Sequence, residues 1–140
     1  MNDRFFLDTN VLVYTFDPSS PAKATRAQAL VGHGVRSRLG AISYQVAQEF
    51  FAVMLRRFEH PARPWEAAEF MDAVLRPLWR VDASPMLLAE ALGLISLHRL
   101  PWYDALIVAA ALEAECAVLY SEDFQDGRRF GPLRVENPFI

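Results

Sequence analysis

A chain of 140 residues with 53% hydrophobic and 22% charged residues has enough apolar material for the core of one domain, and too much for a disordered protein. The formal net charge of −3 argues against a nucleic-acid binder that relies on a wide basic face. The longest apolar run, 105–112, is too short to cross a bilayer. We therefore expect a single domain over residues 1–140 that makes no use of a membrane.

Two features of the sequence bear on whether the protein is secreted. No basic segment followed by an apolar stretch opens the sequence, so no signal peptide is expected. The one cysteine, Cys116, has no second cysteine to pair with, which fits a reducing compartment. These features predict a cytoplasmic protein.

Segments with strand character alternate with segments of helical spacing along the chain. In the first half of the chain, the pattern predicts a strand over 4–7, a helical segment over 11–14, a loop over 18–21, a helix over 22–35 that ends near two glycines, a strand over 38–42 and a helix from Ser43 to about 57. After a break at 61–64, it predicts a helix over 65–75 closed by Pro77, a strand over 78–81 and a helix over 84–98. The chain then continues with a helix over 104–116, a strand over 117–120, a polar loop over 121–131 and a strand over 133–135. Such alternation is typical of a parallel sheet covered on both faces, so the predicted class is α/β with a central parallel sheet.

Four carboxylates stand beside these apolar segments: Asp8, Glu49, Asp104 and Asp123. In open α/β sheets, ligands bind at the carboxyl ends of the strands, and Asp8 and Asp123 both follow predicted strands. Taken alone, Asp8 is better explained as the N-cap of the next helix and Asp123 as a turn residue. Asp104 opens an apolar helix, where a capping role and a ligand role explain it equally well.

Glu49 lies near the edge of the core face of its helix. The core stripe of this helix consists of Val46, Phe50 and Val53. Glu49 stands roughly 60° from the centre of that stripe, an unusual place for an unpaired glutamate. A contact with Arg56 along the helix explains this position as well as a functional role does. A second apolar stripe on the opposite side predicts a partner surface or an overlying helix: Tyr44, Phe51 and Leu55.

As a set, the four carboxylates predict a divalent cation. Hard cations such as Mg²⁺ and Mn²⁺ prefer oxygen ligands, and Thr9, Asn10 and Ser121 add hydroxyl and amide oxygens nearby. The histidines lie away from these acids and no CxxC pair occurs, which disfavours zinc. The sequence also lacks the Gly-rich phosphate loop of an NTPase and the GxSxG turn of a serine hydrolase.

Four segments resemble the acidic motifs of the PIN domain: 7–14 (LDTNVLVY), 45–50 (QVAQEF), 103–111 (YDALIVAAA) and 120–125 (YSEDFQ). Their order, together with the short chain, resembles the VapC ribonuclease toxin of a VapBC toxin–antitoxin pair. Ser121 stands where family members often have threonine, and it keeps the hydroxyl. The resemblance implies a PIN-like, Rossmann-like three-layer α/β/α sandwich with a central parallel sheet.

The resemblance also implies an activity. It implies an Mg²⁺- or Mn²⁺-dependent endoribonuclease that hydrolyses RNA to 5′-phosphate and 3′-hydroxyl products and inhibits translation and growth. Asp8 and Asp104 would bind the ion most directly, and Glu49 and Asp123 would bind a second ion or hold its water. Residues that would orient these ligands are Thr9, Asn10 and Ser121. The implied partners are RNA, a cognate antitoxin whose C-terminal segment fills the toxin groove, and a second copy in a homodimer or larger toxin–antitoxin complex.

Three arginines, Arg56, Arg128 and Arg129, are candidates for contacts with RNA phosphates, although a solvated role explains each of them better. One alternative function is a non-catalytic PIN-like module that binds RNA or a protein. Another is a phospho-accepting signalling domain. Such a domain has a lysine after a late strand, whereas the only lysine here is Lys23.

Overall fold

A six-stranded sheet runs through the centre of the computed structural model, which describes residues 3–56 and 61–140. The strands are β1 (Phe5–Leu7), β2 (Gly40–Ser43), β3 (Trp79–Val81), β4 (Val118–Tyr120), β5 (Arg129–Phe130) and β6 (Leu133–Glu136). Their order in the sheet is β3-β2-β1-β4-β6-β5. Neighbouring strands in this described sheet are parallel, apart from β5, which pairs antiparallel with β6. The sheet is therefore mostly parallel, with one short antiparallel strand at an edge.

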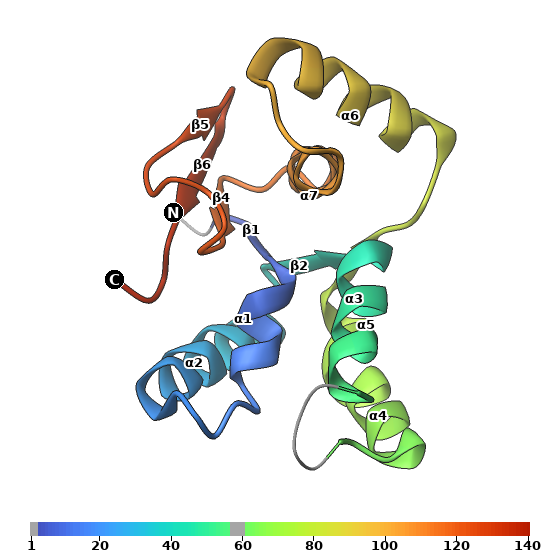
Figure 1. Cartoon of the computed structure of the whole chain (residues 1–140), viewed down its shortest axis with the longest axis vertical. Helices are drawn as coiled ribbons and strands as arrows, with labels where there is room; N and C mark the ends of the chain where they lie inside the picture. Colours follow the sequence, from blue (N-terminus) through green and yellow to red (C-terminus); the bar gives the residue numbers. More distant parts are fainter. Residues whose placement is uncertain (1–2, 57–60) are drawn as a thin grey trace.

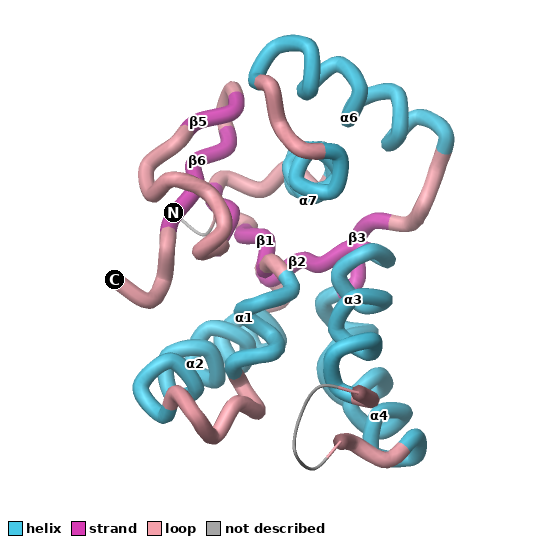
Figure 2. The backbone as a smooth tube through the Cα atoms, in the orientation of Figure 1, coloured by secondary structure: helices cyan, strands magenta, loops and turns pink. Residues whose placement is uncertain are grey.

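Helices cover both faces of this sheet (Figures 1 and 2). They are α1 (Thr9–Tyr14), α2 (Pro21–Ser37), α3 (Tyr44–Met54), α4 (Pro64–Phe70), the π-helical turn η1 (Met71–Leu75), α5 (Arg76–Leu78), α6 (Pro85–His98) and α7 (Trp102–Glu113). In Figure 1, α6 and α7 lie above β1 and β2, and α1 to α5 lie below these two strands. The predicted α/β class with three layers is confirmed. No helix in the described ranges is long and apolar enough to span a membrane.

The core lies where the central strands meet α7. Every residue of β1 and β2 is buried, as expected for strands covered on both faces. In α7, the seven consecutive residues from Ala105 to Ala111 are buried, so this helix contacts the protein interior all round. The N-terminal end of α7 is thereby held at one edge of the sheet.

The glycines at the end of the second predicted helix do not end it. Helix α2 continues through Gly34 to Ser37 because Gly34 faces Gly40 of β2 at very close range. A Cβ atom on Gly40 would lie 2.7 Å from the Cα of Gly34. The two glycines allow the helix to pack directly against the strand, and the prediction that they terminate the helix is wrong.

Other boundaries differ for identifiable reasons. Helix α7 begins at Trp102, directly after Pro101 and two residues before the predicted start at Asp104, which lies in its first turn as expected. The helix predicted to close at Pro77 widens into η1 and continues to the end of α5. The wide turn lies directly before Pro77, which has no N–H and crowds the carbonyl four residues earlier. Helix α3 ends at Met54, short of the predicted end near 57, which lies outside the described residues. The predicted polar loop 121–131 contains β5.

Candidate active site

The site is built where the strand order changes direction. From β1 the chain builds the sheet outward through β2 to β3, and then returns to add β4 on the other side of β1. The carboxyl ends of β1 and β4 therefore open into a crevice, where ligands of open α/β sheets bind. Asp8 directly follows β1, and its backbone N–H donates to the carbonyl of Tyr120 at 3.1 Å. Ser121 directly follows β4 and is fully buried.

Asp8 has two roles in this crevice. Its Oδ1 atom accepts a hydrogen bond of 2.7 Å from the backbone N–H of Thr9, so Asp8 is the N-cap of α1, as expected. Its Oδ2 atom accepts 2.6 Å from the hydroxyl of Ser121. Burial raises the pKa of Asp8 to about 7, the hydrogen bonds from Ser121 and Thr9 oppose the shift, and the charges of Asp123 and Glu49 add to it. Asp8 is 5% exposed and lies near two other acids, so a bound cation would stabilise its ionised form.

Glu49 is half-buried on α3 and faces α1 rather than Arg56. Its Oε1 atom accepts from the hydroxyl of Thr9 at 3.1 Å and from the amide of Gln45 at 3.3 Å. The same Gln45 amide donates to the backbone carbonyl of Tyr103 at 3.3 Å. Gln45 thus connects α3 with the first turn of α7, from the opposite face of the sheet. No contact between Glu49 and Arg56 is present in the described part of the chain.

Asp104 and Asp123 complete the cluster from two further segments. Burial raises the pKa of Asp104, and the charge of Asp123 adds to the shift. Burial also raises the pKa of Asp123, as does the charge of Glu122, whereas the side chain of Asn10 opposes it. The backbone N–H of Asp123 donates to the Ser121 hydroxyl at 3.1 Å, so the turn role predicted for this residue is present as well. The four acids are electrostatically coupled, from β1, α3, α7 and the loop after β4.

The donor set fits a hard divalent cation. It consists of carboxylate oxygens. Burial and the charges of neighbouring acids raise the pKa values of Asp8, Asp104 and Asp123, and a bound cation would oppose that shift. The Oδ1 atom of Asn10 is buried without a hydrogen-bond partner among residues 3–56 and 61–140, and it is a further oxygen donor. Within those same residues, no three acidic, histidine or cysteine side chains are yet close enough together to hold an ion. The ligand chemistry is therefore present, with the side chains more open than in a closed metal site.

The three predicted RNA-contacting arginines are not gathered with the acids. Arg56 is exposed just beyond α3. Arg128 donates to the carbonyl of His98 at 3.1 Å and lies 4.8 Å from the ring of Phe130, so its guanidinium is already engaged. Arg129 on β5 pairs with Arg134, towards the amino ends of the parallel strands and away from the crevice. Their contacts with RNA stay a prediction.

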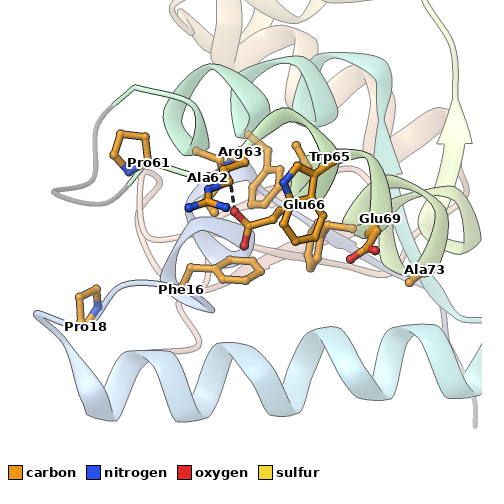
Figure 3. Close-up of a pocket in the computed structure, with 13 residues that line it drawn as sticks. Phe16, Pro18, Pro61, Ala62, Arg63, Trp65, Glu66, Glu69 and Ala73 are labelled. Carbon is orange, nitrogen blue, oxygen red and sulfur yellow. Dashed lines mark hydrogen bonds between the residues drawn. The ribbon is translucent and has the colours of Figure 1, made fainter.

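Two cavities follow the seam between α1 and α3, starting at the acids. The nearer one, of about 460 Å³, includes Thr9, Asn10, Tyr14 and Glu49 in its walls. The larger, of about 1060 Å³, lies beyond it and reaches α4 (Figure 3). We call this larger cavity the apolar groove; its residues are Phe16, Pro18, Phe50, Met54, Pro61, Ala62, Arg63, Trp65, Glu66, Ala67, Glu69, Phe70 and Ala73.

Sequence reasoning missed two parts of this site. Gln45 stands four residues before Glu49, a spacing that places both on one helix face and could have indicated their contact. Glu122 is held by Tyr14 and Lys23, from segments about a hundred positions away. No local pattern in the sequence indicates that pairing.

Comparison with known proteins agrees with this geometry. The family model of the PIN domain matches residues 5–126. Among solved structures, the chain resembles Mycobacterium tuberculosis VapC20, a toxin that cleaves the sarcin–ricin loop, with a TM-score of 0.58 and 19% identity over 84% of this chain and 88% of that one. It also resembles Rickettsia felis VapBC2 bound to a DNA fragment from its promoter, with a TM-score of 0.62 and 19% identity over 94% of this chain and 96% of that one.

At this identity the two structures show a shared fold. A search of curated protein sequences found no match. The family match spans all four predicted acidic motifs, so the recognition made from those motifs is confirmed. The chain belongs to the PIN domain family.

Proposed function

We propose that this protein is a divalent-metal-dependent endoribonuclease, the toxin of a toxin–antitoxin pair, and that it acts in the cytoplasm to inhibit translation and growth. The observation that carries the proposal is the coupling of Asp8, Glu49, Asp104 and Asp123 at the carboxyl ends of β1 and β4. Membership of the PIN family and the fold shared with VapC20 support a nuclease. A non-cleaving PIN-like module is the alternative that the experiments below would reveal.

Each residue has a place in this proposal. Asp8 and Asp104 would hold an Mg²⁺ or Mn²⁺ ion, with Glu49 and Asp123 on a second ion or on its water. A bound cation would neutralise phosphate charge and make water a better nucleophile. Ser121 and Thr9 hold the carboxylates of Asp8 and Glu49 in fixed orientations, which is the usual task of groups that surround metal ligands.

The chain itself would contribute a preorganised carboxylate, Asp8, to the proposed site. The carboxylate of Asp8 is fixed through both of its oxygens before any ligand arrives, so Asp8 itself needs little reorganisation, whereas the other acids would move closer to hold an ion. Asn10 presents its unpartnered amide oxygen from the same helix, in the described part of the chain. RNA phosphates would enter along the nearer cavity between α1 and α3, with Thr9 and Glu49 in its wall.

The apolar groove fits a protein partner. Its inner wall carries three phenylalanine rings, with Phe16 and Phe50 lying 5.0 Å from the ring of Phe70, and Trp65 at its rim is 58% exposed. Of these aromatic residues, Phe16 and Trp65 are exposed, and exposed aromatic side chains beside a groove are typical of protein-binding surfaces. Since R. felis VapBC2 is a toxin–antitoxin assembly, an antitoxin segment with apolar side chains is the proposed occupant. A homodimer or larger toxin–antitoxin complex is proposed on the same basis.

The decisive experiment measures RNA cleavage by the purified protein with Mn²⁺, and again with excess EDTA. Asp8→Asn and Asp104→Asn are expected to abolish cleavage, while Asp72→Asn, an exposed acid on η1, keeps it. Cleavage that survives EDTA, or full activity in Asp8→Asn, would refute the assignment. RNA binding without cleavage would favour the non-catalytic module instead.

The partner is tested separately by co-expression with the product of any small gene found directly upstream of this one. Trp65→Ala is expected to weaken co-purification, because it removes an exposed indole from the rim of the groove. Leu92→Ala on α6, where the leucine is likewise 58% exposed but lies outside the groove, is the matched control. Equal co-purification by the two variants would place the partner elsewhere.

A further inference from the structure

The only lysine of the chain belongs to a small cluster beside the acids. Lys23, on α2, donates from Nζ to Glu122 Oε2 at 3.0 Å and to the hydroxyl of Tyr14 at 3.2 Å. The Tyr14 hydroxyl in turn donates to Glu122 Oε1 at 2.5 Å. Both oxygens of Glu122 are therefore held, one by the ammonium and one by the phenol.

Aromatic packing fixes the two groups that hold Glu122. The ammonium of Lys23 lies 4.7 Å from the centre of the Tyr14 ring and 5.5 Å from that of Phe139. The Tyr14 and Phe139 rings themselves meet edge to face at 4.9 Å. The cluster thus joins α1, α2, the C-terminal segment and the loop after β4, with α1 and α2 side by side in Figure 1.

Glu122 stands between the two residues of that loop that belong to the candidate active site. Ser121 donates to Asp8, and Asp123 is bound through its backbone to Ser121. A free Glu122 would leave a fifth carboxylate beside this crevice without its cation, and would remove the contacts that tie this part of the loop to α1 and α2. As it is, Glu122 is paired with Lys23 and held against Tyr14, so its charge in the crevice is partly balanced.

We propose that Lys23 and Tyr14 are positioning residues for the candidate active site, which hold Glu122 and thereby fix the loop that presents Ser121 and Asp123 to Asp8. This inference rests on the proposed function for its consequence in catalysis. Both residues act on the reacting atoms through Glu122. Tyr14 also lines the nearer cavity, whereas Lys23 does not, so Lys23→Met is the cleaner test.

A purely structural role is the competing explanation. Lys23 and Glu122 keep 39% and 24% of their side-chain exposure, and ion pairs this exposed contribute little to global stability. Loss of the pair should therefore lower the melting temperature of the metal-free protein by about 3 °C or less. Loss of loop order should instead appear locally and in metal affinity.

The test compares Lys23→Met with Arg26→Met. Arg26 lies on the same helix and donates to the carbonyl of Pro138, so its loss removes an equivalent long cation from the same region without touching Glu122. Lys23→Arg keeps the charge and is expected to retain most of the wild-type behaviour. Tyr14→Phe removes only the hydroxyl and keeps the packing on Phe139, which provides a second variant if Lys23→Met is poorly folded.

Two readouts do not depend on cleavage. In metal-free protein, the Asp123 amide should exchange its hydrogen about tenfold faster in Lys23→Met than in wild type, and unchanged in Arg26→Met. The Mn²⁺ concentration that gives half of the maximal thermal shift should rise between about 10- and 100-fold in Lys23→Met and Tyr14→Phe. The Mn²⁺ concentration for half-maximal RNA cleavage should rise in parallel.

Equal exchange and equal Mn²⁺ dependence in Lys23→Met and Arg26→Met would overturn the inference. If wild-type protein does not cleave RNA, the proposed function fails, yet the exchange experiment still decides whether Lys23 holds the loop. If wild type cleaves and the exchange rates do not differ, the positioning role alone fails.

Discussion

The buried carboxylate of Asp8 should make the metal-free protein less stable as the pH rises. Its pKa is raised from 3.8 to about 7 in the folded protein, mainly by burial. The protonated form therefore favours folding, a contribution that is complete below about pH 4 and is lost as the pH rises to about 7. Three pH units at 1.36 kcal/mol each correspond to a loss of about 4 kcal/mol.

Asp8→Asn removes this titration while keeping an oxygen that caps α1. We expect the difference in free energy of unfolding between Asp8→Asn and wild type, measured by urea denaturation in EDTA, to shift in favour of Asp8→Asn by about 4 kcal/mol between pH 4 and pH 8. In Asp72→Asn, where the carboxylate is exposed, the profile should stay parallel to wild type. Parallel profiles for Asp8→Asn and wild type would show that Asp8 does not titrate in this range, and would refute the argument from burial.

Three further outcomes are expected. At pH 8, saturating Mn²⁺ should raise the melting temperature of wild type, since an ion at 100 times its Kd stabilises by about 2.7 kcal/mol. The rise should shrink in Asp8→Asn, and an equal rise would move the ion elsewhere. Gly40→Ala should destabilise by about 1–3 kcal/mol in urea, because its Cβ meets Gly34 at 2.7 Å. Gly93→Ala, with open space around it, should be neutral or stabilising, and the reverse order would contradict the packing argument. Burial raises the pKa of Cys116 to about 12, so iodoacetamide at pH 8 should label it only in urea; rapid labelling of native protein would contradict this burial.

The fold and the four acids could be predicted because their signals are local. A strand that is buried on both faces is a continuous apolar run, and an acid at its end stands out, as at Asp8. The helix starts at Ser43 and Ser84 were predicted for the same reason, and the hydroxyl of each serine accepts a bond from the backbone N–H three residues later. The candidate acids therefore needed no knowledge of distant contacts.

The remaining features depend on tertiary packing. The meeting of Gly34 with Gly40 turned an apparent helix stop into a close helix–strand contact. The two-residue strand β5 is held by pairing with β6 and carries too few residues for a pattern of its own. Lys23 looked like an isolated cation in the sequence, because its partner Glu122 is 99 positions away.

The pairing of β1 with β4 sets when the site can exist. Asp8 and the Ser121 hydroxyl that holds it are 113 positions apart in the chain. During synthesis, β1 leaves the ribosome early and remains unpaired with β4, because β4 emerges only after α7. A nascent chain therefore carries Asp8 and Glu49 but no assembled crevice. A protein proposed to cut RNA is thus unable to cut while most of it is still being made, and it becomes competent only as its last strands join the sheet.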